Sequence, residues 1–147
     1  CGNRGCLEAL TSRWAIERDI RALIRKGRRS IIPRLNKGRL STIKSRILKE
    51  ALYKKDPVVR QVITQVSIDL GKAGISINHI FNPRAILLGG GVIKACGWFM
   101  LPMIEKTIKS DPFFKSFNAC RILRSTLGDD AVPLGAVRLL QHGFGRS

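Results

Sequence analysis

Apolar residues recur at helical spacing along the first third of the chain, and this pattern predicts two helices there. The first helix is expected to run from Leu7 to about Lys26, where basic residues and a following glycine indicate its end. Residues 28–40 are basic and irregular in pattern. A second helix is expected over roughly 42–54, with Ser41 as its N-terminal cap.

Asp56-Pro57 opens a third, longer helix, because aspartate caps helices and proline suits a first turn. Its predicted apolar stripe keeps helical spacing and should lie at the centre of the core. The stripe consists of Val59, Val62, Ile63, Val66, Leu70, Ala73, Ile77 and Phe81. Gly71 and Gly74 lower helix propensity, but they allow a neighbouring element to come close.

The segment 82–92 changes the pattern from helix to strand and back again. Ala85 to Leu88 is a short, unbroken apolar run, which predicts a strand buried on both faces. Gly89, Gly90 and Gly91 follow, and helical spacing then returns. Glycines allow a sharp turn and let a ligand lie against the main chain, although a plain flexible turn explains them equally well.

Three further elements complete an α/β pattern. A helix is expected over about 97–109, where Pro102 fits only if it lies in the first turn. A short strand near 120–125 carries arginines that suit a sheet edge. A last helix is expected over about 131–141, ending at Gly143.

Composition describes a globular domain of 147 residues with enough apolar sequence for a core and no run long enough to span a membrane. The chain begins with Cys1 rather than methionine and shows no targeting signal, so it is expected to be a piece of a longer polypeptide. Four irregularly spaced cysteines favour a reducing cytoplasm over a disulfide framework.

The net charge of +17 is concentrated between Arg13 and Arg60, where 16 Lys and Arg residues face 4 Asp and Glu residues. Such a block suits a phosphate-rich partner, or it is simply a solvated basic surface. Trp14 and Tyr53 are the aromatic residues interspersed with these charges, which gives little support to stacking on single-stranded nucleic acid.

Residues 1–8, Cys-Gly-Asn-Arg-Gly-Cys-Leu-Glu, place two cysteines around a glycine-bearing turn. Two thiolates so arranged can bind one metal ion, but a structural zinc site needs four ligands. Two thiols near a turn remain the alternative interpretation of this segment alone.

The chain resembles the C-terminal half of the ROK family of repressors, open reading frames and sugar kinases. Residues 1–8 match the family's cysteine motif from its second cysteine onward, and 82–92 match its Asn-Pro-x-x-Ile-x-Leu-Gly-Gly-Gly segment. Residues 127–131, followed by 134–136, match the start of the family's closing helix. The resemblance implies an α/β, actin-like ATPase (ribonuclease H-like) fold, with residues 1–147 forming the C-terminal lobe only.

The resemblance also implies a structural zinc ion held by three cysteines and one histidine. Cys1 and Cys6 would be two of those ligands, and the remaining cysteine and histidine would precede this chain. The first few residues of the isolated chain are therefore expected to be disordered and metal-free. His79 and His142 do not match the family's histidine and are interpreted as ordinary surface or packing residues. Cys96 and Cys120 are interpreted as plain thiols.

By the same resemblance, Glu8 would accept hydrogen bonds from sugar hydroxyls, and Gly89, Gly90 and Gly91 would contact ATP. The family's phosphate loop and catalytic aspartate match no residue here, so the chain alone should not phosphorylate a sugar. The parent is expected to be a cytoplasmic glucokinase-like hexose kinase that uses ATP with Mg²⁺, homo-oligomeric and without a membrane partner. A sugar-responsive repressor and a basic module that binds nucleic acid or another polyanion are the alternatives.

Overall fold

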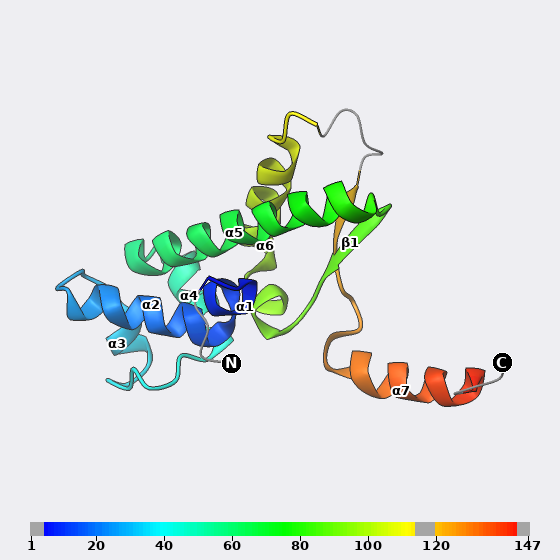
Figure 1. The fold of residues 1–147 in the computed structure, drawn as a ribbon. Coiled ribbons are helices and arrows are strands. Elements are labelled where there is room, and N and C mark those ends of the chain that lie inside the picture. Colours follow the sequence, from blue (N-terminus) through cyan, green and yellow to red (C-terminus); the bar gives the residue numbers. More distant parts are fainter. Residues whose placement is uncertain (1–4, 114–119, 144–147) are drawn as a thin grey trace.

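The computed structural model describes residues 5–113 and 120–143 as a helix-rich α/β unit (Figure 1). The elements in chain order are α1 (Leu7–Thr11), α2 (Arg13–Arg25), α3 (Ile32–Leu35), α4 (Ser45–Tyr53), α5 (Pro57–Phe81), β1 (Ala85–Leu88), α6 (Gly91–Lys109), β2 (Arg121–Arg124), the 3-10 turn η2 (Gly128–Asp130) and α7 (Ala131–His142). Both predicted strands are present, and each predicted helix has a counterpart, although the first one is divided in two and the bounds of the others differ.

The predicted first helix is interrupted at Ser12, so this segment forms two helices, α1 and α2. Ser12 has extended backbone angles, and its hydroxyl accepts a hydrogen bond from the backbone N–H of Ala15 at 3.2 Å. This is the geometry of an N-terminal cap, which satisfies a donor that the first turn of α2 leaves unpaired. The continuous apolar spacing concealed the break, so the prediction of one helix was wrong.

The basic stretch after α2 also contains more structure than its pattern indicated. Ile32 to Leu35 forms the short helix α3, with Pro33 in its first turn. Helix α4 begins at Ser45, and the residue at its N-cap is Lys44, whose side chain makes no capping hydrogen bond. Ser41 is therefore not the cap that the sequence predicted.

Asp56 caps α5 as predicted, and it also ties the preceding loop to the helix. One carboxylate oxygen accepts the N–H of Val59 at 2.8 Å. The other accepts the Ser30 hydroxyl at 2.9 Å and the N–H of Ile31 at 2.7 Å. The side chain is buried, and three donors surround it, so the polar group is fully compensated.

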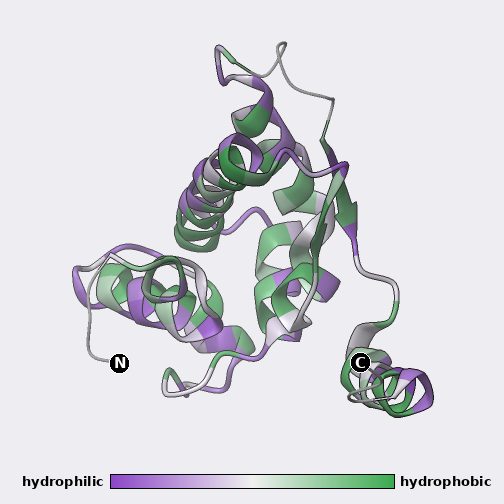
Figure 2. Cartoon of the chain, turned by 45° about the vertical axis from the view of Figure 1, so that its right-hand side comes forward, coloured by the Kyte–Doolittle hydropathy of each residue, from purple (hydrophilic) through white to green (hydrophobic). Residues whose placement is uncertain are grey.

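The core lies between α2, α4, α5 and α6, whose apolar sides face one another (Figure 2). Helices α5 and α6 pack tightly at Gly71 and Gly74, where an added Cβ atom would meet the side chains of Thr107 and Ile108. The predicted close approach is thus confirmed. Near the end of α5 the buried face runs through the two glycines and Asn78, so Ile77 and Phe81 are exposed and were wrongly assigned to the core.

Strands β1 and β2 pair in parallel, with Ala85 opposite Arg121 and Leu88 opposite Arg124. The described residues form a sheet of these two strands. The prediction that β1 is buried on both faces was wrong for this chain, because Leu87 is 65% exposed. The apolar run of β1 is typical of a strand covered on both faces, but the described residues leave part of this strand exposed.

Helix α6 begins at Gly91, so it is longer than expected and Pro102 lies in its interior. Proline lacks an N–H, which removes the intrahelical hydrogen bond to the carbonyl of Trp98. The helix continues because its other side is anchored in the core through Met100, Ile104 and Ile108, all of which are buried. The rule that Pro102 must occupy a first turn is therefore contradicted.

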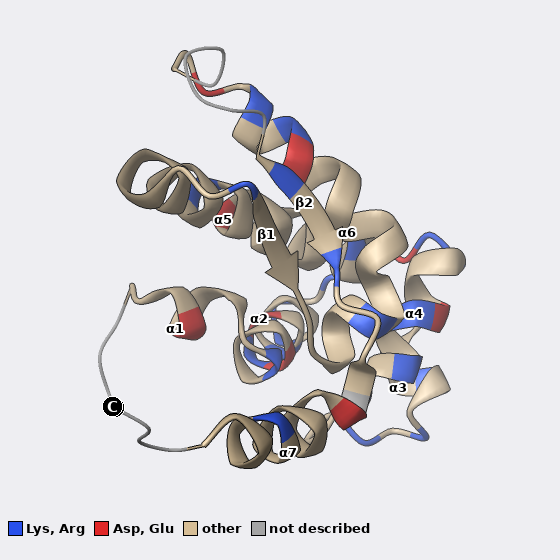
Figure 3. Ribbon diagram, turned by 90° about the vertical axis from the view of Figure 1, so that its right-hand side faces the viewer, with Lys and Arg blue, Asp and Glu red and all other residues tan. Residues whose placement is uncertain are grey.

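Helix α7 lies apart from the other helices and ends at Gly143, whose φ is positive (Figures 1 and 2). Its apolar side chains remain exposed: Val132, Leu134, Val137, Leu139 and Leu140. Within the described residues, no helix combines the length and the apolar character needed to cross a membrane. The blue lysine and arginine segments in Figure 3 are spread over α2 to α6, whereas α7 carries few charges.

Candidate nucleotide site at the glycine turn

The three glycines form a turn that connects the end of β1 to the start of α6. Gly90 has φ +92° and ψ 167°, a backbone conformation that residues with a side chain rarely adopt. A Cβ atom on Gly89 would lie 3.4 Å from the Cβ of Ser125, at the end of the neighbouring strand. The turn therefore requires glycine at position 90 for its backbone, whereas a Cβ on residue 89 would make an ordinary van der Waals contact with Ser125.

The turn presents the N-terminus of α6 to its surroundings. Gly90 occupies the N-cap position and has no side chain that could accept a hydrogen bond from the first turn. Backbone N–H groups and the positive end of the helix dipole are thus available to an anion. A helix N-terminus after a glycine turn is a common binding geometry for phosphate groups.

A cavity of about 350 Å³ lies directly beside this turn. Its lining comes from the glycine turn, the first turns of α6 and the segment that follows β2: Gly89, Gly90, Ile93, Lys94, Arg124, Ser125, Thr126 and Gly128. The segment is held in place because the N–H of Ser125 donates to the carbonyl of Leu88 at 2.8 Å. The cavity combines glycine backbone, two hydroxyls and two cations, which suits a phosphorylated ligand.

The two cations reach the cavity from different elements. Lys94 lies one turn into α6, where its N–H donates to the carbonyl of Gly90 at 2.9 Å. Arg124 comes from the end of β2, and its side chain passes over Gly97 on α6. The glycines were predicted from the sequence but the two cations were not, because the pairing of β1 with β2 is what brings Arg124 to the same cavity as Lys94.

Glu8 lies in the first turn of α1, a helix that packs against α5 and α2. Its side chain is exposed and makes no ion pair with the described residues, while its backbone carbonyl accepts the N–H of Ser12 at 2.9 Å. An exposed carboxylate with unused acceptor positions is chemically suited to sugar hydroxyls.

The described residues do not form a zinc site. Cys6 is an exposed free thiol at the N-cap of α1. Cys1 lies outside the described residues, and so does the segment for which disorder was predicted. No group of three or more His, Cys, Asp or Glu side chains that could hold a metal occurs among the residues the structure describes. A single thiol does not fit a structural zinc ion, which needs four ligands.

The remaining histidines and cysteines behave as structural residues. His79 Nε2 lies 2.6 Å from a carboxylate oxygen of Asp111, which links the ends of α5 and α6. His142 lies exposed in the last turn of α7. Cys96 and Cys120 are free and buried, and burial raises the pKa of both thiols, that of Cys96 from its ordinary value of 9.0 to about 11.

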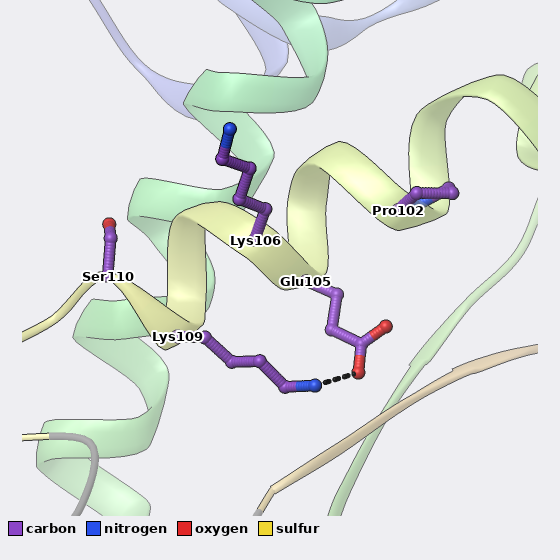
Figure 4. A pocket seen from close by; sticks show the side chains of 5 residues that line it. All are labelled: Pro102, Glu105, Lys106, Lys109 and Ser110. Carbon is purple, nitrogen blue, oxygen red and sulfur yellow. Dashed lines mark ion pairs between the residues drawn. The ribbon is translucent and has the colours of Figure 1, made fainter.

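Two other hollows on the surface are less suited to binding a phosphorylated ligand. One lies on a single side of α6, lined by Pro102, Glu105, Lys106, Lys109 and Ser110, where Glu105 and Lys109 form an ion pair at 2.7 Å (Figure 4). The other lies between α1, α2 and α5 and contains Asp19 and Asp69, already engaged by Arg18 and Gln65. Neither combines backbone donors at a helix N-terminus with two cations in the way that the glycine-turn cavity does.

The family model of the ROK family matches residues 1–142. The chain belongs to the ROK family. It is 32% identical to the glucokinase of Thermotoga maritima over 99% of its own length and 45% of that protein. It is equally 32% identical to the N-acetylglucosamine repressor of Escherichia coli O6:H1 over 98% of its own length and 34% of the repressor. The chain thus spans less than half the length of these curated relatives.

Solved ROK structures have the same fold. A ROK family glucokinase from Streptomyces griseus, in complex with glucose and AMPPNP, aligns with 97% of this chain and 46% of its own (TM-score 0.74, 22% identity). A ROK family transcriptional regulator, a homologue of the Escherichia coli MLC protein, aligns with 84% of this chain and 30% of its own (TM-score 0.69, 29% identity). This ROK chain therefore has the predicted actin-like ATPase fold and corresponds to a C-terminal lobe.

Proposed function

We propose that this ROK chain is the C-terminal lobe of a cytoplasmic hexose kinase of the glucokinase type, and that its glycine turn contacts the nucleotide. The observation that supports this proposal most is the cavity beside Gly90, where α6 backbone donors, Lys94 and Arg124 surround one space. Phosphoryl transfer depends mainly on positioning and on neutralising phosphate charge, and these groups are suited to both tasks.

Each group in the cavity has a separate task in this proposal. Gly89, Gly90 and Gly91 allow the nucleotide to approach the main chain, and the cations Lys94 and Arg124 offset its negative charge. Glu8 accepts hydrogen bonds from the sugar hydroxyls and so orients the hexose. ATP, with Mg²⁺ bound to its phosphates, would supply the phosphoryl group, while the catalytic base would come from the part of the parent outside this chain.

The test uses the full-length parent protein, assayed for ATP-dependent phosphorylation of glucose and other common hexoses. In Gly90→Ala, we expect the KM for ATP to rise about tenfold, because misplacement of the turn costs at least ~1.4 kcal/mol of nucleotide contact. Gly27→Ala is the matched control: Gly27 also has a positive φ, and an added Cβ would likewise meet nothing within 4 Å, but Gly27 does not line the cavity. Equal effects of the two substitutions on KM would contradict the proposal.

The second candidate is a sugar-responsive transcriptional repressor, favoured by the equal identity to the N-acetylglucosamine repressor. In that case the parent would retain sugar binding through Glu8, and the glycine turn would serve the fold without a nucleotide. Isothermal titration of the parent with ATP and with hexoses separates the two functions. Sugar binding that depends on Glu8, without measurable affinity for ATP, would identify the repressor.

A further inference from the structure

A stacked pair of aromatic rings is exposed on the surface formed by α4 and α6. The rings of Tyr53 and Trp98 lie 4.6 Å apart between centroids and are inclined by 11°. Despite this contact, Tyr53 is 59% and Trp98 45% exposed. Tyr53 ends α4 and Trp98 lies in the first half of α6, so the fold brings together two rings that are far apart in the sequence.

Cations flank the pair. The Lys49 ammonium lies 5.9 Å from the centre of the Tyr53 ring, and the Arg60 guanidinium lies 5.8 Å from the centre of the Phe99 ring. Phe99 in turn meets Trp98 edge to face at 5.7 Å. These five residues, Lys49, Tyr53, Arg60, Trp98 and Phe99, are named the aromatic–cationic patch.

The composition of this patch is typical of binding hot spots. Tryptophan, tyrosine and arginine are enriched where protein partners bind, and exposed rings of this size gain free energy when a partner covers them. Among the residues that make up the patch there is no acid, and the nearby Glu50 is engaged by Lys54 at 3.0 Å. The charge of the patch therefore complements an acidic partner rather than a basic one.

Two other occupants fit the geometry less well. A nucleobase needs a free ring face, but Tyr53 already has Trp98 on one side and Lys49 near its ring. A second copy of this chain, docked by the same patch, would place the cations Lys49 and Arg60 against their own counterparts, and like charges repel each other. An acidic protein segment meets neither obstacle, since its carboxylates can pair with the cations and its apolar side chains can cover the ring edges.

We propose that the aromatic–cationic patch is a docking surface for an acidic protein segment with apolar side chains beside its carboxylates. Lys49 and Arg60 bind the carboxylates, and Tyr53 and Trp98 supply the apolar contact. The surface lies apart from the glycine-turn cavity in its residues, since none of the five lines that cavity. The test of docking at this patch is therefore independent of the test of nucleotide binding.

The experiment uses Trp98 as its own reporter. The chain has two tryptophans, so a Trp14→Phe background leaves Trp98 as the single source of tryptophan emission. The probe is a short synthetic peptide of Glu, Ala and Leu, and its control replaces each Glu with Gln. We expect the acidic peptide to bind and to shift the Trp98 emission, and the Gln peptide to do neither.

Affinity is then measured by titration calorimetry in the otherwise native chain. Trp98→Ala should weaken binding of the acidic peptide about tenfold, as expected for one hot-spot ring. Trp14→Ala is the matched control, because Trp14 is 59% exposed and also has a cation, Arg18, at 5.0 Å, but it lies outside the patch. Arg60→Gln, which keeps all the rings, should weaken binding as well and covers the case in which Trp98→Ala fails to fold.

Four outcomes would overturn the proposal. Equal effects of Trp98→Ala and Trp14→Ala on the affinity would show that the patch makes no specific contribution to binding. Tighter binding of an oligothymidylate, with the same dependence on Trp98, would assign the patch to nucleic acid. Sedimentation showing self-association that Trp98→Ala abolishes would assign it to a second copy. Protection of Trp98 from acrylamide quenching in the full-length parent would show that the parent's own chain covers the patch.

Discussion

Gly71 offers a sharp test of how α5 and α6 pack. A Cβ atom added there would lie 2.5 Å from the Cβ and 2.7 Å from the Cγ2 of Thr107, and 3.2 Å from the carbonyl oxygen of Ile104. Thr107 is β-branched, and its hydroxyl donates to the carbonyl of Met103 at 2.9 Å, so its side chain has little freedom to move away. The two helices would have to separate.

The expected cost follows from two opposing terms. Replacing glycine by alanine inside a helix gains up to about 1 kcal/mol of helix propensity. Overpacking a tight core contact costs about 1–3 kcal/mol. Gly71→Ala should therefore lower the free energy of unfolding by up to ~2 kcal/mol net of the propensity gain, which corresponds to a fall in Tm of up to roughly 8 °C for a domain of this size.

Gly97→Ala is the matched control on α6. An added Cβ would meet its nearest atoms at 3.6–3.7 Å, which is ordinary van der Waals contact, so the propensity gain should remain and the protein should become more stable. Gly74→Ala should fall between the two, because the atom 2.6 Å away is the terminal Cδ1 of Ile108, which can rotate. The assay is urea unfolding followed by circular dichroism. If Gly71→Ala and Gly97→Ala shift stability in the same direction, the reasoning from these contacts is refuted.

Three further predictions concern the loop, a buried thiol and the glycine turn. Asp56→Ala should lower the free energy of unfolding by about 2–4 kcal/mol, because it removes the α5 cap and leaves the N–H of Ile31 unpaired. Asp56→Asn should lower the free energy of unfolding by less, as measured in the same urea assay. The Cys96 thiol has a pKa of about 11 in the folded chain, whereas its pKa in the unfolded chain is near 9.0. Because the unfolded chain releases this proton first, the free energy of unfolding should fall by about 2 kcal/mol as the pH rises from 9 to 11. In Cys96→Ala, the free energy of unfolding should depend less on pH over this range. Gly90→Ala should lower Tm by a few degrees through backbone strain alone, and an unchanged Tm would show that the turn relaxes without cost.

The parts of the fold that the sequence predicted well are those whose cause is local. Asp56-Pro57 sets the start of α5 through its own hydrogen bond and ring geometry, and the glycines end β1 through their backbone freedom. Local causes were still missed at Ser12, whose cap divides the first helix, whereas the error at the end of α5 arose because a neighbouring element decides which side is buried. Ile77 and Phe81 continue the apolar stripe of α5, but α6 packs against the side that carries Gly71 and Gly74, so the helix buries that side instead.

The same distinction applies to the candidate site. The glycine turn was visible in the sequence because three adjacent residues form it, whereas Arg124 reaches the cavity only through the parallel register that pairs it with Leu88. A shift of that register by one residue would bring Leu123 to this position and turn Arg124 to the opposite face of the sheet. The anion-binding character of the cavity therefore depends on strand pairing, and pairing between segments that α6 separates cannot be inferred from either segment alone. The signal that could have found Arg124 is its place at the carboxyl end of a strand parallel to β1, since ligand-binding residues in α/β sheets gather at that edge.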